Sequence, residues 1–244
     1  TTESLYGETA SAWSRYYVNQ MNSLTKIIQD YSGTVTPAMA VQGSAQNMIG
    51  VSKIFRAIVM KRVTDAFGDA PFSEAMQIQN GIKTPKYDSQ QAVYTQIIKD
   101  LKDGRDALSS STTAPQGDII YGGNVTKWKK LANSVLLQVA LQMSKKYPSA
   151  TGIAATEFKA ALSNSSGVIE TIADEAWFTF SSSNLLPNPL NAFRAADYRL
   201  SRELVESLKG TSTSFNRTSN HTADTRLKMY NNAFSMSITG LPYG

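Results

Sequence analysis

The sequence predicts a mainly α-helical protein built of tetratricopeptide-like helical hairpins, with long loops and minor short strands. Apolar residues recur every three to four positions over several long segments, as they do on the buried face of a helix. These segments have similar lengths and follow one another as antiparallel pairs would, and such hairpins bury their apolar faces by stacking on neighbours. The alternation typical of short strands or extended segments is confined to residues 165–182, at 168–172 and 177–180.

The first two helices are expected at residues 13–28 and in the segment that follows Pro37. Gly33 is expected to cap the first helix, because glycine readily adopts the backbone conformations found beyond helix ends. The second helix carries apolar residues that drift around its axis, which predicts burial on more than one side, and Gly50 lets a neighbour approach it closely. It should stop at residues 68–71 (Gly-Asp-Ala-Pro), since proline disfavours helix at the residue before it.

Four further helices are expected later in the chain. The third begins near Asp88, which is suited to be its N-cap, with Gln91 three residues on as in a capping box. The remaining three are predicted to open at Asn124 and to span residues 154–162 and 200–208.

Composition and charge narrow the class of ligand. Charged residues make up 18% of the 244 residues, below the usual share of about 25%, and Ser, Thr, Asn and Gln take their place. A polar surface with few charges suits neutral ligands better than ionic ones. The formal net charge of +5 does not predict nucleic-acid binding, because lysine and arginine occur in runs of no more than two and gather on no single face.

No catalytic signature is present in the sequence. There is no cysteine and a single histidine, His221, in a loop rich in Ser, Thr and Asn, so neither a Ser-His-Asp triad nor a Cys/His metal site is predicted. No cofactor is expected, although calcium bound by Asp and Glu stays open, because oxygen ligands need no motif. The nearest carboxylate pairs for glycoside hydrolysis are Asp69 with Glu74 and Asp174 with Glu175. A structural role is favoured for both pairs, so we expect a protein that is not an enzyme.

Aromatic residues are the remaining candidates for ligand binding, because the flat C–H faces of sugars stack on Trp and Tyr rings. Trp128 lies on an apolar helical stripe and is expected in the core. Trp13 and Tyr16 cover two faces of one helix, so we expect at least one exposed ring there. Trp177 and Phe180 precede a loop that contains Asn and Arg side chains. The candidate ligand-binding residues are Trp13, Tyr16, Trp177, Phe180 and Arg194.

Three segments are similar, in order, to those of a known family. They are Phe-Gly-Asp-Ala-Pro-Phe-Ser-Glu-Ala at 67–75, Tyr-Asp-Ser-Gln-Gln-Ala-Val-Tyr at 87–94, and residues 118–128, which begin Asp-Ile-Ile-Tyr-Gly-Gly-Asn. Together they resemble the SusD-like (SusD/RagB) family of outer-membrane nutrient-binding lipoproteins, as a partial chain.

The resemblance implies a surface lipoprotein of the Gram-negative outer membrane. Such a protein binds glycan, oligosaccharide or another nutrient without catalysis and caps a TonB-dependent SusC-like transporter. The lipidated cysteine would precede Thr1, so contact with the membrane is expected only through a lipid anchor missing from this chain. Because family members are longer, residues 1–244 are expected to form a single SusD-like helical domain that is incomplete at both ends. Two alternatives stay open: a glycoside hydrolase on a helical scaffold, and a helical-repeat scaffold that binds only protein.

Overall fold

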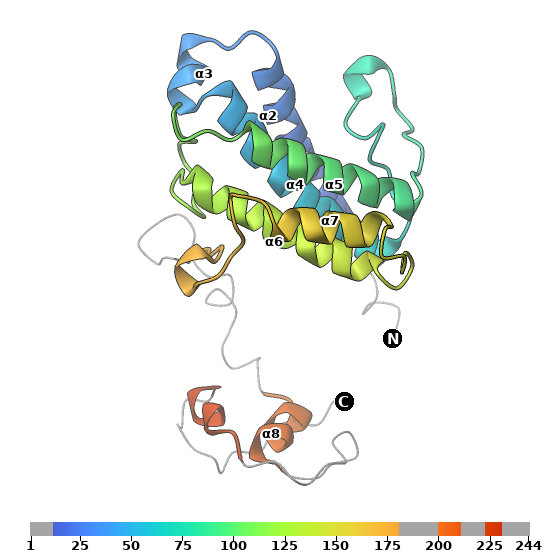
Figure 1. Ribbon diagram of the computed structural model, residues 1–244, viewed down its shortest axis with the longest axis vertical. Coiled ribbons are helices and arrows are strands. Elements are labelled where there is room, and N and C mark those ends of the chain that lie inside the picture. Colours follow the sequence, from blue (N-terminus) through green and yellow to red (C-terminus); the bar gives the residue numbers. More distant parts are fainter. Residues whose placement is uncertain (1–11, 181–199, 211–222, 231–244) are drawn as a thin grey trace. The chain divides into compact units, whose positions relative to one another are not determined.

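The computed structural model describes residues 12–180, 200–210 and 223–230 (Figure 1). The chain divides into two units, residues 1–179 and residues 180–244, and each is described by itself. The single domain expected from the sequence stays a prediction.

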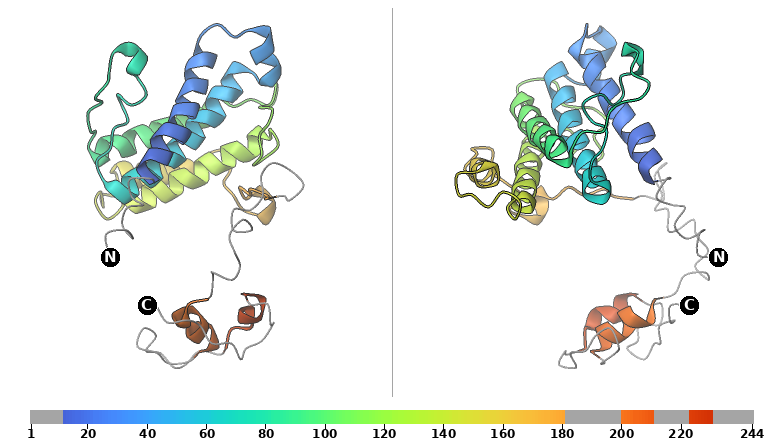
Figure 2. Two further views of the ribbon diagram at one scale, coloured as in Figure 1. Left: turned by 180° about the vertical axis from the view of Figure 1, so that it is seen from behind. Right: turned by 90° about the vertical axis from the view of Figure 1, so that its right-hand side faces the viewer.

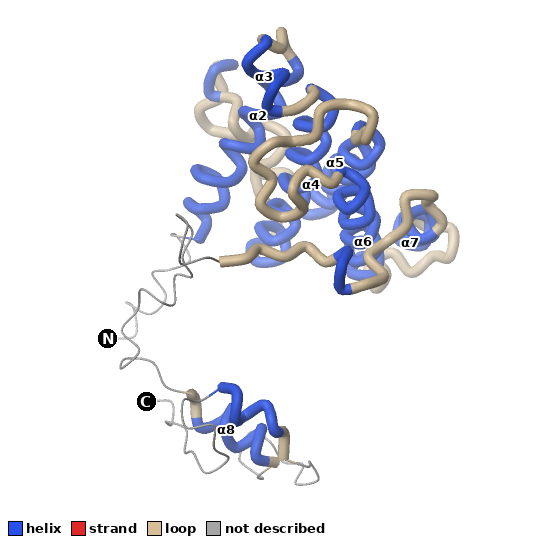
Figure 3. Tube along the Cα trace, turned by 90° about the vertical axis from the view of Figure 1, so that its left-hand side faces the viewer, coloured by secondary structure: helices blue, strands red, loops and turns tan. Residues whose placement is uncertain are grey.

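The first unit is helical, as predicted (Figure 3). Its elements are η2 (Arg15–Met21), α2 (Asn22–Ser32), α3 (Pro37–Gln42), α4 (Ala45–Phe67), η3 (Ile78–Asn80), α5 (Gln90–Ala107), α6 (Val125–Met143), α7 (Ile153–Leu162) and η4 (Ile172–Asp174). The second unit contains α8 (Arg202–Lys209) and η7 (Thr225–Tyr230).

The helices of the first unit pack against their neighbours in chain order. α2 contacts α4, α4 contacts α5, α5 contacts α6, and α6 contacts α7, while α4 also touches α6 (Figure 2). Successive hairpins therefore bury their apolar faces on one another, which confirms the predicted tetratricopeptide-like packing. α4 is the central helix of the unit, because η2, α2, α5 and α6 all contact it.

The short strands predicted at residues 168–172 and 177–180 do not form within the described part of the chain. Residues 172–174 make the 3₁₀ turn η4, and the segment around them is irregular. Side chains bind its backbone N–H groups: that of Ile169 donates to Ser134 Oγ at 2.9 Å and that of Glu170 to Asp174 Oδ2 at 3.4 Å. Side chains thus take the place of a partner strand for two N–H groups of residues 168–172.

Two predicted helices differ in detail from the structure. The first helix contains a π-helical segment, η2, which follows the α-helical residues 12–14, and it continues to Ser32, where Gly33 caps it as expected. The helix predicted after Pro37 is interrupted at Gly43, whose φ of 155° no helix allows. Ser44 then restarts it as the N-cap of α4 by accepting the N–H of Asn47 at 3.4 Å.

Trp128 lies in the core, as its helical stripe predicted. Its side chain is 2% exposed, and its ring meets the rings of Phe55 and Tyr121 edge to face. The indole Nε1–H donates to Asp118 Oδ2 at 2.7 Å. The Asp118 carboxylate also accepts three backbone N–H groups from residues 120–123, so one side chain fixes the loop before α6 and anchors Trp128 to it.

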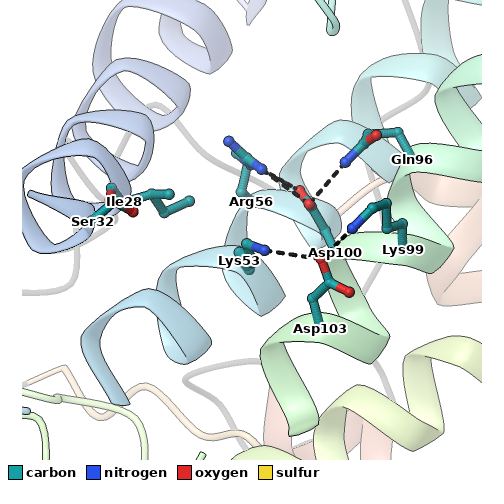
Figure 4. A network of polar contacts seen from close by, with 8 residues as sticks. All are labelled: Ile28, Ser32, Lys53, Arg56, Gln96, Lys99, Asp100 and Asp103. Atoms are coloured by element: carbon teal, nitrogen blue, oxygen red, sulfur yellow. Dashed lines mark hydrogen bonds and ion pairs between the residues drawn. The ribbon is translucent and has the colours of Figure 1, made fainter. Parts of the chain in front are cut away.

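The contact between α4 and α5 combines a close backbone approach with a buried ion pair. A Cβ atom added at Gly50 would lie 2.8 Å from the carbonyl oxygen of Gly104, and one added at Gly104 would lie 2.7 Å from that of Gly50. One helical turn away, Arg56 binds Asp100, which is 1% exposed, through Nε at 2.8 Å and Nη2 at 3.0 Å (Figure 4). Gln96 also donates to this carboxylate, at 3.0 Å.

We expect Gly50→Ala to destabilise the protein by about 1–2 kcal/mol, since overpacking a backbone contact outweighs the helix propensity that alanine gains. The free energy of unfolding, measured by urea titration, checks this. Gly33→Ala is the matched control, because an added Cβ there lies 3.6 Å from Asp30 O, at ordinary contact distance. Equal stability of the two variants would contradict the prediction.

Candidate functional site

Four aromatic rings gather where α4 ends, and we call them the Trp13 cluster: Trp13, Tyr17, Phe67 and Tyr87. The ring centroid of Trp13 lies 4.7 Å from that of Tyr17 and 5.0 Å from that of Phe67. Tyr87 stacks on Trp13 at 6.2 Å with an interplanar angle of 15°. Tyr87 is 65% exposed and Phe67 37%, so the cluster presents aromatic surface to solvent while Trp13 is half-buried.

The π-helical segment η2 holds the inner side of this cluster. Tyr17 and Met21 are its buried residues, and the Tyr17 hydroxyl donates to the carbonyl oxygen of Pro71 at 2.8 Å. Burial raises the pKa of Tyr17, and nearby Tyr87 and Asp88 raise it further, so the hydroxyl stays protonated as a donor. Tyr17 thereby joins the first helix to the turn that follows α4. π-Helical turns are rare and occur frequently at functional sites.

Asp88 fixes the outer side of the cluster, beside Tyr87. Its carboxylate accepts the backbone N–H groups of Phe72 at 3.0 Å and Ser73 at 2.7 Å, and the Ser73 hydroxyl at 2.8 Å. Its backbone forms a bridge with Ala70. The prediction that Asp88 is the N-cap of the third helix is therefore wrong: Ser89 caps α5 by accepting the N–H of Ala92 at 3.3 Å. The Asp88 carboxylate does not cap α5, because it binds the two backbone N–H groups of the turn at 72–73 instead.

Three of the four carboxylates considered for hydrolysis have a structural partner, and the fourth, Glu175, is exposed. Asp69 Oδ1 accepts the N–H of Gln90 at 2.8 Å, and Glu74 accepts the N–H of Lys86 at 3.1 Å. Asp174 pairs with the ammonium of Lys130 at 3.0 Å. These contacts agree with the structural role that the sequence favoured.

Of the other predicted site residues, the structure describes Tyr16, Trp177 and Phe180. Tyr16 is half-buried and packs against the core, as Trp13 does, so the prediction of an exposed ring at Trp13 or Tyr16 is wrong. Trp177 is 60% exposed, and Phe180 is exposed and belongs to the second unit. Arg194 lies outside the described residues, as does His221.

The rings that surround Trp13 were not all predicted. Phe67 and Tyr87 come from residues 67–75 and 87–94, two segments that carry the family resemblance, and neither residue is among the predicted ligand-binding residues. Tyr87 lies in the sequence between Pro85 and the start of a predicted helix. An aromatic residue in a loop does not belong to the buried stripe of a helix, and this position was the one local indication that the ring is exposed.

In residues 12–180, 200–210 and 223–230, no three His, Asp or Glu side chains gather closely enough to hold a metal ion. Over the same ranges, no helix combines the length and the apolar character that crossing a membrane requires. The expectation of no cofactor, with calcium left open, stays a prediction.

We expect Asp88→Asn to be less stable than the wild type at pH 7 by about 1 kcal/mol, because neutral hydrogen bonds replace charge-assisted ones. Burial alone would raise the pKa of Asp88, but the bonds from Ser73 and Phe72, with Lys86 nearby, lower it overall. A carboxyl with a lowered pKa stabilises the fold above its unfolded pKa near 4 and loses that contribution as the pH falls through its folded pKa.

The difference in urea midpoint between wild type and Asp88→Asn should therefore shrink from pH 7 to pH 3. Asp106→Asn is the control, because the Asp106 side chain is exposed and bonds to the adjacent Arg105. A difference that is unchanged across this pH range would show that Asp88 does not act through its charge.

Comparison with solved structures places this geometry among known folds. A chitin-binding protein is 35% identical, with a TM-score of 0.57 over 68% of this chain and 33% of that one. A SusD-like protein of Bacteroidetes AC2a is 31% identical, with a TM-score of 0.59 over 71% of this chain and 30% of that one. A SusD homologue from Bacteroides uniformis is 28% identical, with a TM-score of 0.58 over 81% of this chain and 36% of that one. The chain thus spans about a third of the length of these relatives.

No curated protein matches the sequence. The family described as SusD-like, "Starch-binding associating with outer membrane", matches residues 3–238. This match covers nearly the whole sequence, and the helical fold agrees with the solved relatives. The chain therefore belongs to the SusD-like family.

Proposed function

We propose that this chain is part of a non-catalytic protein that binds glycan or oligosaccharide at the cell surface and delivers it to a TonB-dependent SusC-like transporter. The family match over residues 3–238 carries the proposal, because that family is described as starch-binding and associated with the outer membrane. The relative described as a chitin-binding protein supports carbohydrate as the ligand class. A lipid anchor would attach the protein to the membrane.

The Trp13 cluster is the surface on which we place glycan contact. Tyr87 offers an exposed ring face stacked on Trp13, and Tyr16 lies on the same helix as Trp13. The Asp88 contacts fix the backbone beside Tyr87, and stacking on Trp13 orients the Tyr87 ring before a ligand arrives. A rigid platform loses little conformational entropy on binding, which favours affinity.

Trp177 is the second proposed contact, with Phe180 and Arg194 following it in the sequence. Its exposed ring could receive another sugar face. The two surfaces make separate predictions, because Trp177 and Tyr87 can be replaced independently.

We expect Tyr87→Ala to weaken binding of starch or chitin oligosaccharides about tenfold. Stacking on an aromatic ring contributes about 1–3 kcal/mol for a nucleic-acid base, a sugar face falls at or below this range, and 1.4 kcal/mol is a factor of ten in Kd. The melting temperature should change little, because Tyr87 is 65% exposed. Isothermal titration of wild type, Tyr87→Ala and Trp177→Ala measures the contribution of each surface.

Val41→Ala serves as the control, since Val41 is 69% exposed on α3 and lies outside both aromatic surfaces. A hydrolysis assay on the same sugars runs beside the titration. Turnover that disappears in Asp69→Asn or Glu74→Gln would favour a glycosidase. Tight association with the transporter, without binding of any sugar, would favour a protein-binding scaffold.

A further inference from the structure

A cleft of about 510 Å³ lies apart from the Trp13 cluster, and we call it the Tyr94 cleft. It is bordered by the end of α4, the first turns of α5 and the end of α6. The residues that carry its chemistry are Asp65, Asp69, Gln91, Tyr94, Gln142 and Tyr147. No member of the Trp13 cluster lines it. Its volume falls within the range of about 300–1,000 Å³ that is typical of small-ligand sites.

Asp65 is held in place at one wall of this cleft by donors from three helices. The Lys61 ammonium binds its Oδ2 at 2.7 Å, while Gln142 Nε2 donates to Oδ1 at 3.0 Å and the Tyr94 hydroxyl donates to the same oxygen. Burial and the bond to Asp65 raise the pKa of Tyr94, which keeps the phenol protonated. A carboxylate has about four acceptor positions, so Oδ2 retains one for a ligand.

Asp69 and Gln91 supply further polar groups that the fold does not use. Asp69 Oδ1 accepts the N–H of Gln90, whereas Asp69 Oδ2 accepts no hydrogen bond from the described residues. The exposed side chain of Gln91 likewise makes no hydrogen bond within the part of the chain that the structure describes. The cleft thus offers carboxylate acceptors together with an amide, which both donates and accepts.

The charge of the cleft indicates a neutral ligand. Lys61 offsets Asp65, and Lys146 lies in the lining together with Asp69. No excess of positive charge is present for a phosphate, and no excess of negative charge is present for a metal ion or an amine. Buried Met143 and the ring of Tyr147 add apolar surface. A lining that combines many polar groups with some apolar surface suits hydroxyl groups and C–H faces on the same molecule.

We propose that the Tyr94 cleft is a second binding site, which takes a short neutral oligosaccharide independently of the Trp13 cluster. The identification of the ligand as a sugar rests on the proposed function. The separation of the two sites rests on the structure, because they involve different residues near the end of α4. Phe67 contacts Trp13, whereas Asp65 and Asp69 line the cleft.

Maltotriose and triacetylchitotriose are the probes, and the backbone amide shifts of the full chain in NMR spectra are the readout. We expect one of them to shift the amides of Tyr94 and Gln142 in a saturable way, in wild type and in Tyr87→Ala alike. Gln91→Trp, which fills the cleft from its rim, should weaken this response at least tenfold. Gln138→Trp is the matched control, since Gln138 is also exposed but does not line the cleft.

A second variant keeps the test valid if Gln91→Trp does not fold. Asp69→Asn retains the oxygen that accepts the N–H of Gln90 but removes the charge, so we expect about fivefold to tenfold weaker binding in the cleft. Shifts at Tyr87 without shifts at Tyr94 would overturn the cleft proposal and leave the proposed function standing. Cleft shifts of equal strength in wild type and both variants would also overturn it. Absence of any response to either sugar in wild type would overturn the proposed function and the cleft with it.

Discussion

The buried contact between α4 and α5 is the constraint on which the rest of the structure depends. The pair Gly50 and Gly104 lets the two backbones touch, and the Arg56–Asp100 ion pair fixes how they are aligned. Burial raises the pKa of Asp100 even though Arg56 opposes the shift, so the site has a high desolvation cost. An ion pair in such a place adds little net stability, but removing one partner leaves an uncompensated buried charge. The Arg56–Asp100 pair therefore disfavours any other register of α4 and α5, because another register would leave both charges buried without a partner.

This alignment determines what surrounds the junction where α4 ends and α5 begins. Phe67 and Tyr87 meet Trp13 on one side, while Asp65 and Tyr94 line the cleft on another. Asp65 of the cleft lies two positions before Phe67 of the cluster, and Tyr94 of the cleft lies seven positions after Tyr87 of the cluster. A shift of α4 relative to α5 would therefore disrupt both surfaces. The hydrogen bond from Gln90 to Asp69 and the Ala70–Asp88 bridge then close the junction.

The sequence predicted the parts of the fold that local patterns control. The periodicity around Trp128 identified a core helix, and Asn124 was recognised as its start because the N-cap residue acts on its own helix. The Trp13 cluster was only partly predictable, since Phe67 and Tyr87 reach Trp13 from distant segments. Asp88 and Ser89 are both good N-caps, and a tertiary contact with the 72–73 turn decided between them. The strand-like pattern at 168–172 gave no sign that Ser134 and Asp174 would bind its N–H groups.

Two of the segments that resemble the SusD family share one structural feature, an aspartate that accepts several backbone N–H groups. Asp88 and Asp118 each precede a helix, and each carboxylate accepts several backbone N–H groups. Those bound by Asp88 belong to the turn at 72–73, and those bound by Asp118 belong to its own loop at 120–123. Such carboxylates specify where loops run, and hence the architecture that a family shares. Gln91, three positions after Asp88, has its side chain exposed to solvent, so folding places little constraint on its identity. A change at Gln91 can therefore alter ligand choice without disturbing the scaffold, whereas a change at Asp69 affects both, because Asp69 lines the cleft and also accepts the N–H of Gln90.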